Sequence, residues 1–232
     1  MKKLAVITGG SKGIGKALVE KFAEEGFQVL TCARDLKALN QLKADLKLKG
    51  FTIEVVSADL SVKEEVLRFA EQVKILGVPT VLINNTGIFV QGQIHNEEDG
   101  VLEKQIQTNL YSAYHLTRAL VPAMMKEKKG HIFNMCSTAS ITPYINGGSY
   151  CITKYALLGM TKVLREELKT HGIRVTAILP GATYTSSWEG VDIPQERFMK
   201  SEDVASAIWA AYSLSDQAVI EELLLRPQLG DL

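Results

Sequence analysis

The feature that most constrains the fold is a regular alternation of short apolar runs with longer segments of helical periodicity. The apolar runs are continuous rather than interrupted at every second position, which is typical of parallel strands buried on both faces. Seven strands are predicted: Leu4–Thr8, Gln28–Ala33, Thr52–Val56, Thr80–Asn84, His131–Met135, Arg174–Leu179 and Val219–Leu225.

Six segments between these strands carry apolar residues at a spacing near 3.6, which predicts helices. They are Ile14–Glu25, Leu36–Lys49, Lys63–Ile75, Leu102–Lys128, Tyr150–Thr170 and Glu202–Leu214. Parallel strands joined by crossover helices form an α/β sheet with helices on both faces. No linker rich in Pro, Gly or Ser divides the chain, so we expect one doubly wound, single-domain sheet over residues 1–232.

Residues at the segment boundaries agree with these helices. Asp35 and Ser61 stand where a side chain caps a helix N-terminus. Gly50 and Gly172 follow helices, where the left-handed conformation closes a C-terminus.

Composition excludes several classes of protein. The 26 basic and 26 acidic side chains cancel, whereas nucleic-acid binding favours a basic excess or stripe. No segment approaches the ~18 apolar residues of a membrane span, and Leu4–Ile7 is too short for a secretory signal. We therefore expect a soluble, cytoplasmic protein with no nucleic-acid or membrane partner.

The three cysteines, Cys32, Cys136 and Cys151, are an odd number without C-x-x-C spacing. This argues against a disulfide framework or a zinc site, fits a reducing compartment, and leaves them as small core residues. The four histidines lack the spacing of metal ligands, so we predict no metal.

The first strand runs into the glycine-rich turn TGGSKGIG (residues 8–15) and then directly into a helix. Gly9 permits a tight turn, Gly13 lets the backbone approach a pyrophosphate, and Gly15 allows close packing of the helix on the strand. The N–H groups of the helix N-terminus then face the anion. The spacing G-x-x-x-G-x-G is a variant of G-x-G-x-x-G and predicts a nucleotide site. The alternative is a turn that merely needs small residues.

The end of the second strand indicates which dinucleotide binds. An acidic residue there would bind the ribose 2′-hydroxyl and repel a 2′-phosphate, but the strand ends at Arg34, with Lys12 available from the glycine turn. The two cations predict NADP(H). Asp35 competes as a ribose ligand for NAD, although a capping role is the stronger expectation. Asp59 either binds the adenine amino group or is a turn residue.

Tyr150 and Lys154 are four residues apart near the start of a predicted helix, so their side chains leave the same face. A tyrosine with a pKa near 10 is a poor acid or base at neutral pH. A lysine ammonium ~5 Å away, at an effective dielectric of ~20, favours the phenolate by about 3 kcal/mol, roughly two pK units. Ser137, after the fifth strand, would hold a substrate oxygen. Together, Ser137, Tyr150 and Lys154 suit hydride transfer to a carbonyl.

Four further motifs follow the glycine turn in order: Asn84-Asn85-Thr86-Gly87, Asn109, Ser137 with Tyr150-x-x-x-Lys154, and Pro180-Gly181. On these residues essentially the whole chain resembles the short-chain dehydrogenase/reductase family. The resemblance implies one NAD(P)-binding Rossmann domain and an oxidoreductase acting on CH–OH and C=O groups. It departs from the family at Thr86, where Ala is usual, and this change could shift the backbone against the nicotinamide ribose.

The resemblance also implies roles for individual residues. It makes Asn109, Ser137, Tyr150 and Lys154 a catalytic tetrad, in which Asn109 holds a relay water and Lys154 also binds the nicotinamide ribose. The implied cofactor contacts are Gly9, Ser11, Lys12, Gly13, Ile14 (through its backbone), Gly15, Arg34, Asp59, Leu60, Asn85, Thr86, Gly87, Tyr150, Lys154, Pro180, Gly181, Thr183 and Thr185.

Specificity should lie in the walls over the nicotinamide, formed by Ile88-Phe89, the residues after the fifth strand and residues 182–200. The predicted substrate-binding residues are Ser137, Thr138, Tyr144, Tyr184 and Trp188. The aromatics of residues 182–200 either flank a flat ring or pack the loop onto the body.

The segments at residues 180–188 and 221–231 resemble those of bacterial sepiapterin-reductase-like members, which reduce carbonyls on a pterin side chain with NADPH. Similar tails occur in 3-oxoacyl-carrier-protein reductases and 3-hydroxy-acid dehydrogenases. A catalytically silent NADP-binding sensor is the alternative of a different class, and the intact tetrad argues against it. The resemblance also implies a homodimer or homotetramer built through the long helices at residues 102–128 and 150–170.

Overall fold

A computed structural model of the chain describes residues 2–188 and 190–232. In this part of the chain, seven parallel strands form one sheet in the order β3-β2-β1-β4-β5-β6-β7. The strands are β1 (Leu4–Thr8), β2 (Gln28–Ala33), β3 (Ile53–Ser57), β4 (Val81–Asn84), β5 (Gly130–Met135), β6 (Ile173–Pro180) and β7 (Glu222–Leu225). The predicted doubly wound sheet is confirmed, and its strand order reverses between β1 and β4.

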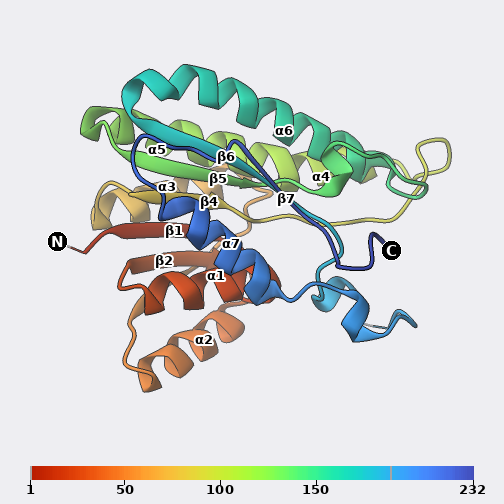
Figure 1. The fold of residues 1–232 in the computed structure, drawn as a ribbon, viewed down its shortest axis with the longest axis horizontal. Coiled ribbons are helices and arrows are strands. Elements are labelled where there is room, and N and C mark those ends of the chain that lie inside the picture. Colours follow the sequence, from red (N-terminus) through yellow and green to blue (C-terminus); the bar gives the residue numbers. More distant parts are fainter. Residues whose placement is uncertain (1, 189) are drawn as a thin grey trace.

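Helices cover both faces of the sheet (Figure 1). On one face lie α1 (Gly13–Glu24), α2 (Leu36–Leu48) and α7 (Ser201–Tyr212), and on the other α3 (Lys63–Leu76), α5 (Ser112–Glu127) and α6 (Gly148–Leu168). Alternate residues of β1 serve the two cores: Ala5 and Ile7 pack with α1, whereas Leu4 and Val6 pack with α3 and α5. Burial of both strand faces explains the continuous apolar runs in the sequence.

The predicted helix over Leu102–Lys128 is wrong as one element. The structure has α4 (Val101–Ile106), a π-helical turn at Gln107–Tyr111 and then α5. The Thr108 hydroxyl donates to the Lys104 carbonyl at 2.9 Å, and the Ser112 hydroxyl donates to the Thr108 carbonyl. Side-chain bonds of this kind compete with the regular helical ladder, and a π-helical turn inside a helix frequently marks a functional site.

Three of the four predicted caps are confirmed. The Asp35 carboxylate accepts a hydrogen bond from the Ala38 N–H at 3.0 Å, and Gly50 and Gly172 have φ of +86° and +70°. The cap predicted at Ser61 is wrong, because α3 begins at Lys63 and Ser61 instead donates its N–H and hydroxyl to Asp59. β7 is shorter than predicted because only Glu222–Leu225 pair with β6.

All three cysteines are free and buried, which confirms them as core residues. Burial raises the pKa of the Cys32 thiol to about 12 and that of Cys136 to about 11, so neither is a reactive thiolate at neutral pH. Over the described ranges, no helix is long and apolar enough to cross a membrane.

Candidate active site

The residues singled out from the sequence lie along one edge of the sheet. Since all seven strands are parallel, their carboxyl ends face the same side, and the strand order reverses there between β1 and β4. Ligands of doubly wound sheets bind in the crevice at this reversal. The turns after β1, β2, β4, β5 and β6 therefore form the candidate site (Figure 1).

The glycine turn after β1 has the close contacts that its sequence predicts. Gly9 and Gly13 have φ of +71° and +53°, a conformation that favours glycine. A Cβ on Gly15 would lie 2.1 Å from the Gly9 carbonyl oxygen, so α1 packs against the turn itself. Gly10 was not among the predicted residues, yet a Cβ on Gly10 would lie 2.0 Å from the Thr31 hydroxyl of β2. The adjacent glycine pair was the signal available for it.

The N-terminus of α1 suits an anion. Lys12 occupies the N-cap position of the helix, but its side chain makes no capping hydrogen bond. The first turn carries no acidic residue. The first N–H groups of a helix have no intrahelical partner and carry the positive end of the helix dipole. By contrast, Asp35 caps α2, and α3 and α7 carry acids in their first turns. A phosphate or pyrophosphate would supply what α1 lacks.

The end of β4 is tied to the glycine turn through Thr8. The Thr8 hydroxyl accepts hydrogen bonds from the Asn85 N–H at 2.9 Å and the Thr86 N–H at 3.0 Å. The Asn85 side-chain amide donates to the Thr8 carbonyl at 2.9 Å. Asn85 thus fixes the turn. A Cβ on Gly9 would lie 3.2 Å from the Thr86 hydroxyl, so this departure from the family pattern lies directly against the turn.

Basic side chains follow β1 and β2, and an acidic one follows β3. Lys12 and Arg34 are exposed, and neither forms an ion pair with any residue of the described chain. Partial burial raises the pKa of the Asp59 carboxyl, but hydrogen bonds from Ser61 and the charge of Arg34 lower it below its ordinary value. Asp59 therefore has a turn role in its segment, and its contact with the adenine amino group stays a prediction. The Leu60 side chain is buried in the core, so only its backbone faces the edge.

Lys154 and Tyr150 lie together near the start of α6. Lys154 is 4% exposed, and its ammonium donates a hydrogen bond to the Met135 carbonyl at 2.7 Å. Its nitrogen lies 5.6 Å from the centroid of the Tyr150 ring. A Cβ on Gly87 would lie 3.6 Å from this nitrogen and 3.4 Å from the side-chain oxygen of Asn109. The structure therefore brings Gly87, Asn109, Tyr150 and Lys154 to one place.

Asn109 lies in the π-helical turn and is 1% exposed. Its side-chain oxygen accepts a hydrogen bond from the Ile88 N–H at 2.7 Å, and its nitrogen donates to the Ile88 carbonyl at 2.9 Å and to the Thr153 hydroxyl at 3.0 Å. The amide thereby links the segment after β4 to α6. Helical periodicity gave no signal of this turn.

Ser137 lies two residues after β5 and caps a short 3-10 turn, Thr138–Ser140, which packs against α6. Its hydroxyl oxygen accepts a hydrogen bond from the Ala139 N–H at 3.1 Å, which leaves the hydroxyl hydrogen free to donate elsewhere. Tyr144 is half-exposed. Burial, together with nearby Tyr150 and Cys151, raises the pKa of its phenol well above the ordinary range.

The segment after β6 returns to the glycine turn. The Gly181 N–H donates to the Leu225 carbonyl of β7 at 2.8 Å, next to the pairing of Pro180 with Leu225. The Thr183 hydroxyl donates to the Gly181 carbonyl at 3.1 Å. A Cβ on Gly13 would lie 3.0 Å from the Thr185 side chain. The cofactor residues predicted after β1 and after β6 are therefore neighbours.

The aromatic residues of the loop before α7 pack on one another. The Tyr184 and Trp188 rings lie 5.7 and 4.9 Å from the ring of Phe198, which is itself buried. This arrangement supports packing of the loop onto the body rather than two rings that flank a ligand. Residue 189, within the predicted specificity segment, lies outside the described residues.

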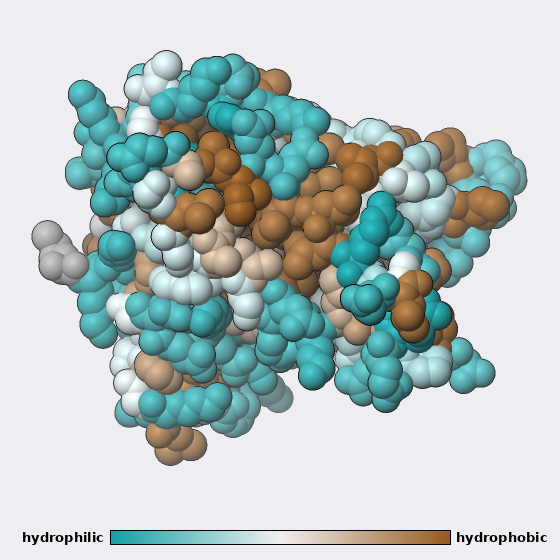
Figure 2. All heavy atoms as spheres, viewed as in Figure 1, coloured by the Kyte–Doolittle hydropathy of each residue, from teal (hydrophilic) through white to brown (hydrophobic). Residues whose placement is uncertain are grey.

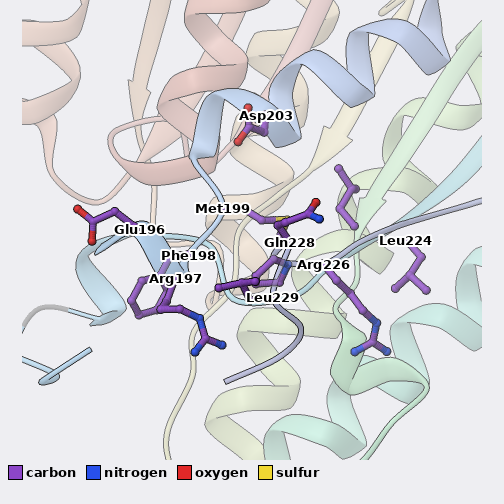
Figure 3. Close-up of a pocket in the computed structure, with 11 residues that line it drawn as sticks. Glu196, Arg197, Phe198, Met199, Asp203, Leu224, Arg226, Gln228 and Leu229 are labelled. Atoms are coloured by element: carbon purple, nitrogen blue, oxygen red, sulfur yellow. The ribbon is translucent and has the colours of Figure 1, made fainter. Parts of the chain in front are cut away.

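A pocket of about 530 Å³ lies between this loop and the tail after β7 (Figure 3). It is lined by Glu196, Arg197, Phe198, Met199, Asp203, Leu224, Leu225, Arg226, Pro227, Gln228 and Leu229. None of the predicted catalytic residues lines it, so we do not assign it to the substrate. Within residues 2–188 and 190–232, no group of three or more His, Cys, Asp or Glu residues could hold a metal ion.

Comparison with known proteins agrees with this geometry. Residues 3–195 match the family model for short chain dehydrogenases. The chain is 31% identical to the sepiapterin reductase of Chlorobaculum tepidum, over 100% of this chain and 99% of the relative. It is 31% identical to the 3-oxoacyl-[acyl-carrier-protein] reductase of Haemophilus influenzae, over 93% and 92%. A solved metagenomic short-chain oxidoreductase in complex with NADP is 31% identical, with a TM-score of 0.86 over 97% of each chain.

Proposed function

The chain belongs to the short chain dehydrogenase family of oxidoreductases, and from this premise we propose that it reduces the carbonyl of a small molecule to an alcohol with NADPH. The observation that carries the proposal is the Lys154 ammonium, buried without a carboxylate partner beside the Tyr150 ring. Lysine is almost never fully buried unless it is paired. A buried lysine with no carboxylate partner, beside a tyrosine at the carboxyl edge of a doubly wound sheet, therefore points to a functional site.

The residues present fit the cofactor. The uncapped start of α1 and the glycines whose Cβ atoms would collide with the turn leave a backbone surface for a pyrophosphate. Lys12 and Arg34 would hold the 2′-phosphate, because they are exposed and unpaired in the described chain while Asp35 is engaged as a helix cap. When bound, NADPH supplies the hydride that the carbonyl carbon accepts.

Tyr150 is the proton donor of the proposed reaction. Its phenol would donate a proton to the substrate oxygen as negative charge develops there, and the Lys154 ammonium nearby stabilises the phenolate that remains. The Ser137 hydroxyl, which accepts from Ala139, would use its own hydrogen to bind the same oxygen. The two remaining N–H bonds of Lys154 would hold the nicotinamide ribose, and Asn109 would hold the water of a proton relay.

We propose the carbonyl on a pterin side chain as the first substrate to test and a 3-oxoacyl thioester as the second. The names of the two enzyme relatives support these classes at equal identity. Wild-type protein should oxidise NADPH in the presence of sepiapterin or acetoacetyl thioesters, followed as loss of nicotinamide absorbance. Tight NADPH binding with no turnover of any carbonyl would instead support a silent sensor module.

We also propose a homodimer or homotetramer. Apolar side chains gather over the middle of the face shown in Figure 2, where α6 and the edge strand β7 lie. Val163 of α6 and Leu224 of β7 are among the exposed apolar residues. Light scattering on purified protein tests this state. The free, buried cysteines support a reducing compartment, and we propose the cytoplasm.

A further inference from the structure

The helix that carries Tyr150 and Lys154 begins without a cap of its own. Gly147 precedes α6 and has no side chain to offer, and the first turn of α6 contains no acidic residue. The N–H groups at a helix start need an acceptor when they are buried. Ser149, in this first turn, is 2% exposed.

Glu97 supplies the acceptor from another part of the chain. It lies in the segment between β4 and α4, and one of its carboxylate oxygens accepts a hydrogen bond from the Ser149 N–H at 2.8 Å. The other oxygen accepts from the Ser149 hydroxyl. A carboxylate at a helix N-terminus is favoured both by these charge-assisted bonds and by the helix dipole. Ser149 directly precedes Tyr150 in the sequence.

Glycines at the contact allow the carboxylate to reach the helix. A Cβ on Gly148 would lie 2.0 Å from a carboxylate oxygen of Glu97, and a Cβ on Gly92 would lie 2.6 Å from its Cγ. The Gly92 N–H donates to the Asn146 carbonyl at 3.1 Å, and the Gln93 side chain donates to the Asn146 side chain at 2.6 Å. The segment is thus docked on the start of α6 at several points.

The same segment also touches Tyr150 itself. Phe89 lies near its beginning, and the Phe89 ring packs edge-to-face on the Tyr150 ring with centroids 5.0 Å apart. The residues between β4 and α4 therefore hold the first turn of α6 at its backbone, through Glu97, and at its tyrosine ring, through Phe89.

We propose that Glu97 is a positioning residue for the reaction: by capping α6 at Ser149 it fixes the first helical turn and, with it, the direction of the Tyr150 phenol. This inference rests on the proposed function. Glu97 has no contact with Lys154 or the glycine turn among the described contacts, so it acts on the geometry of proton transfer and leaves cofactor binding unchanged. Misplacement of a reacting group by about 1 Å lowers the rate of the chemical step.

The test compares three variants. For each, kcat and NADPH affinity are measured, and circular dichroism gives the folded fraction. We expect Glu97→Ala to lower kcat about tenfold or more, with NADPH affinity within about twofold of wild type. Glu97→Gln should recover most of kcat, because its amide oxygen still accepts from the Ser149 N–H. Glu98→Ala is the matched control, since this neighbouring carboxylate is exposed and has no described partner, and it should behave as wild type.

Amide hydrogen exchange separates this inference from the proposed function, because it requires no substrate. Exchange at Ser149 should be faster in Glu97→Ala than in wild type. Unchanged exchange, a wild-type kcat in Glu97→Ala, or a fall in kcat no larger than the loss of folded protein would each overturn the positioning role. Absence of carbonyl reduction by the wild-type protein would overturn the proposed function and the catalytic part of this inference, while faster exchange would still support the cap.

Discussion

At the scale of single residues, three basic side chains lie where they contribute little to the stability of the fold. Lys154 is buried and donates to a backbone carbonyl, and Lys12 and Arg34 are exposed and form no ion pair within residues 2–188 and 190–232. Burying an ammonium costs free energy unless it is paired. Under the proposed function, Lys12 and Arg34 would bind a dinucleotide phosphate, and Lys154 would serve the nicotinamide ribose and the Tyr150 phenol.

Arg34→Ala should discriminate between the two dinucleotides. Removing one charge-assisted contact to the 2′-phosphate should weaken NADPH binding about tenfold, or about 1.4 kcal/mol, and leave NADH binding within about twofold. Titration followed by nicotinamide fluorescence measures both constants. Lys37→Ala, which removes an exposed lysine three residues away, is the control. Equal weakening of both cofactors would exclude Arg34 as the phosphate ligand.

At the scale of elements, the start of each helix after a strand differs in what caps it. The α1 N-terminus has neither a side-chain cap nor an acid, whereas Asp35 caps α2. An acid already bound to its own helix cannot serve as freely as a ribose ligand. Under the proposed function, the uncapped start of α1 would accept the pyrophosphate that both dinucleotides share, while the basic side chains and the engaged Asp35 favour NADP over NAD.

Asp35→Ala should destabilise the fold without changing cofactor preference. Loss of the bond to the Ala38 N–H should lower the free energy of unfolding by about 1 kcal/mol, measured by urea denaturation. Asp35→Asn should keep most of that stability, because asparagine caps equally well. If Asp35→Ala weakened NADH binding and left stability intact, the carboxylate would be a ribose ligand instead.

Sequence patterns predicted the elements that depend on local properties. The bounds of β1 and β2 agree with the apolar runs because every inward position of a buried parallel strand must be apolar. The π-helical turn at Asn109 and the cap at Ser149 were not predicted. The cap at Ser149 depends on a bond to Glu97, 52 residues away in the chain, and Asn109 of the π-helical turn bonds Ile88, 21 residues away. No local pattern encodes such pairs.

At the scale of the whole molecule, the two edges of the sheet at which the strands begin and end have different roles. The carboxyl edge holds the candidate site, whereas His131 lies at the start of β5, at the opposite edge. Its ring is fully buried, stacks on Phe133 and bonds the Thr176 hydroxyl at 2.7 Å. Burial first, and the charge of Arg174 second, lower the pKa of His131 to about 2.

This burial predicts an acid-sensitive stability. The unfolded chain protonates His131 below its ordinary pKa of about 6.5, while the folded protein does not, so the unfolded state binds more protons. The free energy of unfolding should therefore have its full value above that pH. Below it, protonation of His131 in the unfolded state should lower this free energy by up to about 1.4 kcal/mol per pH unit. Urea denaturation from pH 7.5 to 5 should show a shallower fall in His131→Gln than in the control His95→Gln. Parallel pH curves for the two variants would exclude His131 as the source.

The rate of NADPH-dependent carbonyl reduction by Tyr150→Phe, set against wild type, tests most directly whether this edge of the sheet is a reductase site. The variant keeps the ring that packs on Phe89 and loses only the hydroxyl. We predict a fall in kcat of about a hundredfold or more, with NADPH affinity within about twofold, and no fall in the control Tyr155→Phe, whose tyrosine is exposed on the same helix. Undiminished reduction by Tyr150→Phe would contradict the assignment of Tyr150 as the proton donor.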